Sequence, residues 1–233
     1  MNWQAIKISQ DNKSYTYNGN ILFNRDFHDA LKFHAPGLAA VQDESGWYHI
    51  DTFGNELYVE RYTRTFGYYY NRAAVVQGCN HFHLNETGVR AYSNNYNWTG
   101  NFQEDLCAVR NNQNQYFHID LNGERIYTNN FVYVGDFKDG IACVKTKEGK
   151  FRHLDNYGNF INDKEFVDLG IFHKNIATAK NHNGWCHIDK SGKELYTERY
   201  SVVEPFYNGY ALVEGFDNQK RIIDEKGTIV VTI

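Results

Sequence analysis

Five histidines are the residues of this sequence best suited to chemistry, because each stands in a repeated His-Ile-Asp-like motif: His49, His83, His118, His153 and His187. Imidazole binds metal ions and transfers protons near neutral pH. Equivalent histidines of successive motifs, however, are separated by two or three strands, or roughly 10–19 Å. Zinc holds its nitrogen ligands only about 2.1 Å away. We therefore expect these histidines to be buried and bonded to the protein, through turn backbone or the neighbouring Asp.

Other catalytic patterns are missing from the sequence. His81 and His83 have a chelate-like spacing but lack a third ligand, so no metal is expected. No serine, cysteine or lysine stands in a nucleophile motif, and no glycine-rich phosphate loop is present. We expect a non-enzymatic protein without a cofactor. Paired carboxylates that meet only in space stay open as an alternative, because a sequence does not reveal them.

A turn glycine that recurs every 34 or 35 residues shows what positions the histidines. An aspartate stands three residues before most of these glycines, and Asp-x-x-Gly suits a tight turn. Aromatic residues follow most of them after four, eight and fourteen residues. Self-similarity at a fixed period indicates a repeat architecture. The repeated structural positions include Asp51, Gly54, Gly88, Asp120, Gly123, Asp155, Gly158, Asp189 and Gly192.

Each repeat predicts a small-residue strand, a hairpin, the His-Ile-Asp strand, the Asp-x-x-Gly turn, a third strand and an aromatic connector. The first strand is clearest at 140–144 and 209–213, where Ala142 and Ala211 should lie at a close approach of backbones. Connectors such as 131–134 and 200–203 have the composition of a short fourth strand. We predict one repeat domain, 1–233, with units of roughly 1–33, 34–68, 69–102, 103–137, 138–172, 173–206 and 207–233.

Composition excludes several functional classes. The 24 basic and 28 acidic residues give a net charge of −4 without a run of like charges. A nucleic-acid or anionic-membrane surface normally needs a basic patch, so neither partner is expected. No signal peptide or membrane-spanning run is apparent. The four scattered cysteines suit reduced thiols, and we expect a cytoplasmic protein.

The repeated elements resemble the bacterial WG-repeat (WG/KWG β-repeat) family. The resemblance is carried by Gly-Leu-Ala-Ala-Val (37–41), the Gly-Trp hairpin (46–47), the His-Ile-Asp-x-x-Gly motif and Glu-Arg-Tyr (60–62 and 198–200). It spans nearly the whole chain, and the His in place of the family's common Tyr marks a His-Ile-Asp-type variant. It implies a β-repeat scaffold with no catalytic residue. Such variants can precede methyltransferase-like domains, so an accessory subunit of such an enzyme is one alternative function.

Two architectures suit three or four antiparallel strands every 35 residues: a closed propeller and an open β-superhelix. The small first-strand residues favour a seven-unit propeller-like ring, since propeller strands converge on an axis. The short period and the missing last connector favour the open form. We predict an all-β repeat with a propeller-like ring.

The loops that enter the small-residue strands differ from unit to unit, which suits a recognition surface on a repeated frame. We therefore predict binding of a protein partner through these loops, with carbohydrate binding at the exposed Tyr96-Asn97-Trp98 segment as the alternative. The candidate binding residues are His34, Tyr69, Tyr70, Asn97, Trp98, Lys138, His173 and Tyr207.

Overall fold

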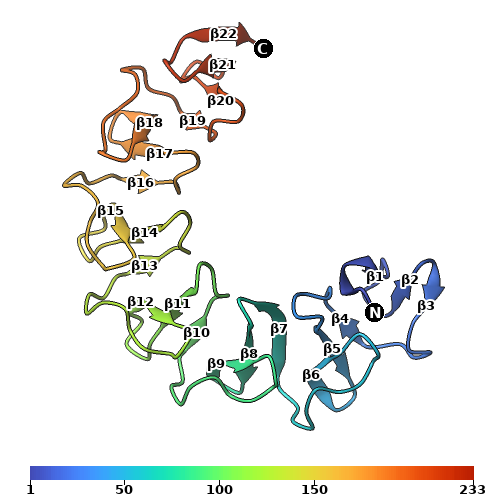
Figure 1. Ribbon diagram of the computed structural model, residues 1–233. Helices are drawn as coiled ribbons and strands as arrows, with labels where there is room; N and C mark the ends of the chain where they lie inside the picture. The colour runs from blue at the N-terminus through green and yellow to red at the C-terminus, as the bar shows by residue number, and fades with distance from the viewer. The chain divides into compact units, whose positions relative to one another are not determined.

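The computed structural model describes residues 1–233, which form seven small antiparallel sheets along the chain (Figure 1). A single 3-10 turn, η1 (Trp3–Ala5), precedes the first strand. The chain divides into two compact parts, residues 1–125 and residues 126–233. The N-terminal part contains four sheets and the C-terminal part contains three.

The sheets of the N-terminal part are three-stranded and follow chain order. Their strands are β1 (Ile6–Ile8), β2 (Tyr15–Tyr17) and β3 (Asn20–Ile21); β4 (Asp29–Ala30), β5 (Ala39–Asp43) and β6 (Gly46–Ile50); β7 (Arg64–Tyr69), β8 (Arg72–Gln77) and β9 (Asn80–Asn85); and β10 (Trp98–Thr99), β11 (Leu106–Arg110) and β12 (Tyr116–Asp120).

The C-terminal part continues the same pattern and ends with a four-stranded sheet. Its strands are β13 (Tyr133–Val134), β14 (Ile141–Lys145) and β15 (Phe151–Asp155); β16 (Asp168–Leu169), β17 (Ile176–Asn181) and β18 (Gly184–Asp189); and β19 (Val202–Val203), β20 (Tyr210–Glu214), β21 (Lys220–Asp224) and β22 (Ile229–Thr232).

Strand register fixes which loops share an end of each sheet. Ala39 of β5 pairs with Ile50 of β6, so the loop entering β5 and the turn leaving β6 emerge together. The hairpin that joins β5 to β6 emerges at the opposite end, where Asp43 pairs with Gly46. The expected small-residue positions are buried: Ala142 is 0% exposed and Ala211 is 3% exposed.

The connector supplies the first strand of the sheet that follows it, as in β4, β7 and β10, whereas the expected third strand is broken in most units. In the second unit its pairing is reduced to two isolated bridges, Ile50 with Glu56 and Trp47 with Tyr62. Between these two bridges β6 advances by three residues, from Trp47 to Ile50, whereas the opposite segment advances by six, from Glu56 to Tyr62. The extra residues form a bulge, and Tyr58, which lies in it, reaches the next unit.

The ring of Tyr58 covers the turn glycine of that next unit. A Cβ added to Gly88 would lie 2.2 Å from Cδ1 of Tyr58, and Gly88 also has φ +80°. Glycine is therefore required twice, by the left-handed backbone and by the covering ring. The same contact recurs between Phe23 and Gly54, Tyr92 and Gly123, Tyr127 and Gly158, and Tyr196 and Gly227.

The core of the protein consists of side chains between successive sheets. The aromatic residues fourteen positions after the turn glycines are all buried, and the small residues of the first strands pack beside them. A continuous buried cluster extends from Ile141 to Ile223 within the C-terminal part. Each unit thus buries its apolar surface against its neighbours, as repeat proteins do.

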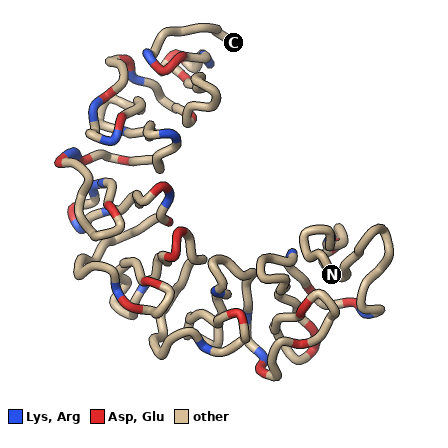
Figure 2. Tube along the Cα trace, in the orientation of Figure 1, with Lys and Arg blue, Asp and Glu red and all other residues tan.

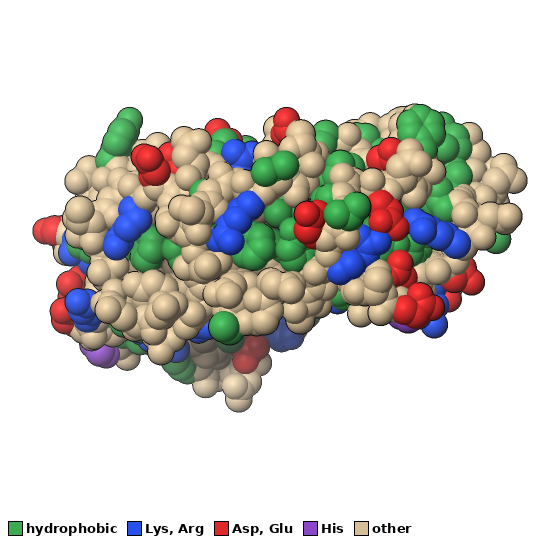
Figure 3. Space-filling model, turned by 90° about the horizontal axis from the view of Figure 1, so that it is seen from below, with side chains coloured by type: hydrophobic (Ala, Val, Ile, Leu, Met, Phe, Trp, Pro, Cys, Tyr) green, Lys and Arg blue, Asp and Glu red, His purple; other side chains and the backbone are tan.

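Charged residues are scattered through the loops of both parts (Figure 2). On the face drawn in Figure 3, basic, acidic and hydrophobic side chains are interspersed. All four cysteines are free thiols, and Cys107, Cys143 and Cys186 are buried. No helix of the structure has the length and apolar composition to span a membrane.

Candidate functional site

Each repeated histidine whose contacts are described lies between two successive sheets. His49 on β6 places Nε2 2.8 Å from the carbonyl oxygen of Phe66 on β7, which lies 17 residues further along the chain. His83 contacts the carbonyl of Gly100 in the same way, at 3.0 Å. The same bond joins His153 to Gly170 at 2.8 Å and His187 to Glu204 at 2.9 Å. We call these bonds the histidine clamps.

The clamps fix the protonation of each ring. A carbonyl oxygen only accepts, so Nε2 carries the proton and Nδ1 is the acceptor of a neutral ring. In His49, Nδ1 lies 2.5 Å from the hydroxyl of Tyr58, which donates to it. Burial penalises the imidazolium and lowers the pKa of His49, His83 and His153 to about 4. These rings are therefore neutral at pH 7.

The tyrosine donor stands nine residues after its histidine, at the position that covers the next turn glycine. Tyr92 donates to His83 at 2.5 Å, and Tyr196 donates to His187. The fifth unit has Asn162 at this position, and Nδ1 of His153 is buried without a partner.

The first and last units show what the clamp requires. In the first unit the hydroxyl of Tyr15 donates to the carbonyl of Leu31 at 2.6 Å, so a tyrosine replaces the histidine. In the last unit Ile222 occupies the histidine position, and this apolar side chain makes no such bond. The clamp thus depends on a polar ring at this position.

The histidine partners differ from those expected from the sequence, because they lie in the connector and the next sheet instead of the motif's own turn or aspartate. His118 is also buried. Asp51 instead accepts bonds from the backbone of its own turn, at Phe53 and Asn55, 2.8 and 2.9 Å away. The structure contains no group of three or more His, Cys, Asp and Glu residues placed to hold a metal ion.

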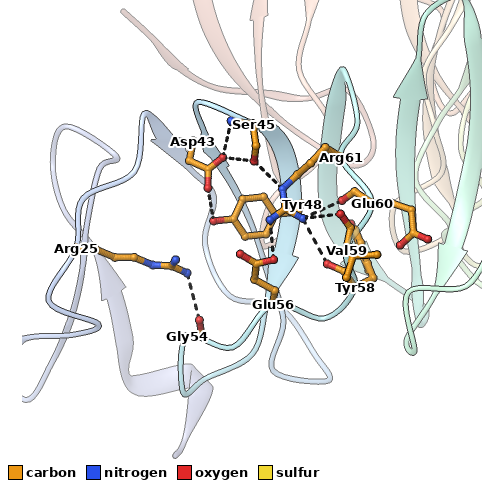
Figure 4. Close-up of polar contacts among 10 residues, drawn as sticks. All are labelled: Arg25, Asp43, Ser45, Tyr48, Gly54, Glu56, Tyr58, Val59, Glu60 and Arg61. Carbon is orange, nitrogen blue, oxygen red and sulfur yellow. Dashed lines mark hydrogen bonds and ion pairs between the residues drawn. The ribbon is translucent and has the colours of Figure 1, made fainter.

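Arginines hold the bulges of several units. The guanidinium of Arg61 lies 3.9 Å from the centre of the Tyr48 ring, and its Nη2 pairs with Glu56 at 2.6 Å. Its Nη1 donates to the carbonyls of Val59 and Glu60, both at 3.1 Å (Figure 4). The Glu-Arg-Tyr motif therefore stabilises the bulge that carries the covering tyrosine.

Most entering loops are two-residue turns with left-handed backbone at both central residues. Tyr70 and Asn71 have φ of 50° and 58°, and Lys174 and Asn175 have φ of 49° and 70°. Such turns match the twist of a hairpin. The residues that flank each turn lie at the ends of strands. The entering loops therefore share one backbone conformation although their sequences differ.

His34 and Tyr69 are the two candidate residues that the structure brings together. Their ring centres are 4.7 Å apart. Nothing larger than a hydrogen fits at Gly67, because a Cβ there would lie 2.6 Å from the His34 ring. Both residues line a cavity of about 340 Å³ in the N-terminal part, together with Lys32 and Asn101. Burial lowers the pKa of His34, and nearby Lys32 lowers it further.

The other candidate loop residues do not join this cavity. Tyr70 occupies a turn position beside it and is exposed, as is Tyr207. Lys138, His173 and Tyr207 lie in the C-terminal part, each bridged to the start of its own small-residue strand. They stand at equivalent positions of successive units.

Asn97 and Trp98 lie at the opposite end of their sheet from the entering loop. Trp98 pairs with Arg110, next to the hairpin, and its ring centre is 5.9 Å from that of Tyr116. Beside them lies a cavity of about 400 Å³ lined by Asn94, Asn95, Tyr96, Asn111, Asn112, Gln113, Phe117 and Arg125. We call this cavity the amide groove. Its amide-rich loops are visible in the sequence, but their proximity is not.

Comparison with known proteins supports these assignments at the level of fold. Residues 188–217 match the family model for the WG containing repeat, which supports the resemblance to WG-repeat proteins. No curated protein matches the chain by sequence.

Three solved structures are similar along nearly the whole chain. A eukaryotic initiation factor has a TM-score of 0.62 at 14% identity, covering 98% of this chain and 72% of that one. BamB from Moraxella catarrhalis has a TM-score of 0.51 at 12% identity, with 100% and 86% covered. The computationally designed Ika8 protein has a TM-score of 0.50 at 12% identity, with 98% and 85% covered. The predicted all-β, propeller-like repeat fold is confirmed.

Proposed function

We propose that this chain is a non-enzymatic scaffold that binds a protein partner, and that the cavity beside His34 and Tyr69 receives an anchor side chain of that partner. The observation that carries this proposal is the convergence of three successive units on one recess. Lys32, Gly67 and Asn101 occupy the same repeat position yet have different chemistry. The corresponding positions that meet at this recess thus differ in chemistry, as selective recognition requires.

The contacts around the recess suit recognition without rearrangement. His34 rests on the Gly67 backbone and against the Tyr69 ring, so both rings are held by packing. A preorganised tyrosine supplies contact area at a small cost in side-chain entropy. Lys32 is the cationic residue of the lining and favours an anchor with an acidic or polar end.

The rest of the frame supports a binding role over catalysis. The clamp histidines bond backbone carbonyls through Nε2, and most of them accept a tyrosine hydroxyl through Nδ1. Their lowered pKa values follow from burial, and they serve the packing of successive sheets. The propeller-like fold is itself suited to interaction surfaces.

A photo-crosslinking amino acid in place of Tyr69 tests this proposal. In lysate of the source organism it should capture a discrete protein, and the same substitution at Tyr207 is the matched control. With the partner purified, Tyr69→Ala and Lys32→Ala should each weaken binding by about tenfold or more, as hot-spot residues do. Equal affinity of wild type and both variants would place the interface elsewhere.

A further inference from the structure

The amide groove is a second recess of the N-terminal part, built from two loops of successive units. Asn94 and Asn95 stand in the bulge of one unit, and the hairpin 111–115 of the next unit faces them. The volume of about 400 Å³ is within the range of small-ligand sites. The groove lies at the hairpin end of its sheet, away from the His34–Tyr69 cavity.

Its hairpin is held in one conformation by Asn111. The Oδ1 of this residue accepts from the backbone N–H groups of Gln113 and Gln115, both at 3.0 Å. Its Nδ2 donates to the side chain of Gln115 at 3.1 Å. Asn112 and Gln113 are therefore presented from a fixed turn, and their side chains are exposed and make no hydrogen bond within the protein.

The loop on the opposite side of the groove, which contains Asn94 and Asn95, has side-chain amide donors and acceptors available for a ligand. Asn95 accepts a bond from Arg90 through Oδ1 at 2.7 Å, which leaves its two Nδ2 hydrogens for a ligand. Asn94 donates to the carbonyl of Gly123 at 3.2 Å, which leaves its Oδ1 as an acceptor. Donors and acceptors thus face the groove from both sides.

We infer that the amide groove binds a neutral oligosaccharide. Each sugar hydroxyl both donates and accepts, which matches side-chain amides in alternation. Tyr96 and Phe117 are only 6% and 4% exposed, so the floor offers no apolar recess for a peptide side chain. The guanidinium of Arg125 lies over Phe117, 3.9 Å from its ring centre.

The charge of the lining distinguishes this groove from its counterpart in the C-terminal part. The equivalent groove of the C-terminal part has Lys164, Glu165, Lys193 and Glu194 in its lining, so it lacks this neutral amide surface.

Titration with cellotetraose, maltotetraose and chitotetraose, followed by side-chain amide NMR, tests this inference. At least one tetrasaccharide should shift the resonances of Asn112 and Gln113. The double variant Asn112→Ala/Gln113→Ala should weaken that binding by about tenfold, the loss expected for two hydrogen-bonding groups.

The matched control is His182→Ala/Asn183→Ala in the equivalent hairpin of the C-terminal part, which should bind as wild type does. Circular dichroism of both exposed-loop variants should match wild type. Three results would overturn the inference: no shift with any of the three sugars at millimolar concentration, equal affinity of the Asn112/Gln113 variant, or equal binding of a neutral Gly-Ser peptide. None of them bears on the His34–Tyr69 cavity, because the two recesses share no residue.

Discussion

The hydroxyl of Tyr58 lies 2.5 Å from Nδ1 of His49, while the ring that carries it covers Gly88 of the following unit. One side chain therefore completes the histidine clamp of its own unit and closes the turn of the next. The clamp's other bond, from Nε2 to the carbonyl of Phe66 on β7, reaches the next sheet. The histidine, the tyrosine nine residues after it and the turn glycine of the next unit are thus linked by direct contacts.

Replacing Tyr58 by Phe keeps the ring on Gly88 and removes the donor to His49. We expect the free energy of unfolding to fall by about 1–3 kcal/mol, because a buried acceptor loses its partner. Urea denaturation measures this. Tyr62→Phe is the control, since its ring packs 5.7 Å from that of Tyr58 and its hydroxyl makes no described hydrogen bond. Equal effects of the two variants would show that the clamp bond contributes nothing.

The fifth unit offers the reverse experiment. Asn162→Tyr supplies the hydroxyl that Nδ1 of His153 lacks, at a position where other units carry tyrosine. We expect this variant to be stabilised by about 0.5–1.5 kcal/mol through the new hydrogen bond. Asn162→Phe adds the ring without the donor and separates packing from bonding. A tyrosine variant no more stable than the phenylalanine variant would contradict the prediction.

Gly88→Ala and Gly78→Ala separate backbone strain from ring contact. Both glycines have positive φ, but only Gly88 is covered, since nothing lies within 4 Å of a Cβ at Gly78. Gly78→Ala should cost about 1–2 kcal/mol for the left-handed backbone. Gly88→Ala should cost about 1–3 kcal/mol more, because Tyr58 must move. Thermal denaturation of the pair checks the difference, and identical melting temperatures would exclude the ring contact as a constraint.

Acid should unfold this protein through its clamp histidines. The pKa of His49, His83 and His153 is about 4 in the folded chain and about 6.5 in an unfolded one. Burial lowers the pKa of His187 as well. Between these values the unfolded state binds more protons, so the free energy of unfolding decreases as pH falls. Above about pH 6.5 both states are neutral at these rings and the contribution is constant.

The slope approaches about 1.4 kcal/mol per pH unit for each such histidine. Urea midpoints at about pH 7.5 and about pH 5 measure it. His83→Gln removes one titrating group and should flatten the dependence. A wild-type midpoint that does not change over this interval would contradict the assignment. Carboxylates such as Asp51, whose pKa is lowered by bonds within its turn, lose their contribution only at lower pH.

The repeat itself could be predicted from the sequence because its signals are local. The period of the turn glycines, the Asp-x-x-Gly turn and the hairpin between the first two strands depend on residues close in the chain. The strand at 133–134 also formed where the connector composition favours it. The third strand formed only in the first and last units, as β3 and β22. In the second unit the corresponding segment is a bulge whose Tyr58 contacts Gly88 of another unit, a contact that no local pattern reveals.

The partners of the clamp histidines and the two recesses could not be predicted from the sequence, because they too depend on contacts between units. The regular offsets of His49 and Tyr58 are visible in the sequence, but their contact depends on the bulge between them. His34 was predicted as a binding residue, yet its contact with Tyr69 rests on the space left by Gly67. Asn112 and Gln113 look like ordinary polar loop residues until the bulge of the preceding unit is placed opposite them.

Each histidine clamp joins a residue to one further along the chain, and this restricts how the number of repeats can change. In four units a histidine bonds a carbonyl 17 residues further along the chain, and in most units an aromatic ring covers the turn glycine of the next unit. A tandem duplication of one whole period recreates every donor, acceptor and covered glycine at the new junction. A duplication of any other length misplaces all of them at once. We therefore expect the fold to accept a gain or loss of a whole repeat more readily than an insertion or deletion of another length, which would keep the 34–35-residue spacing.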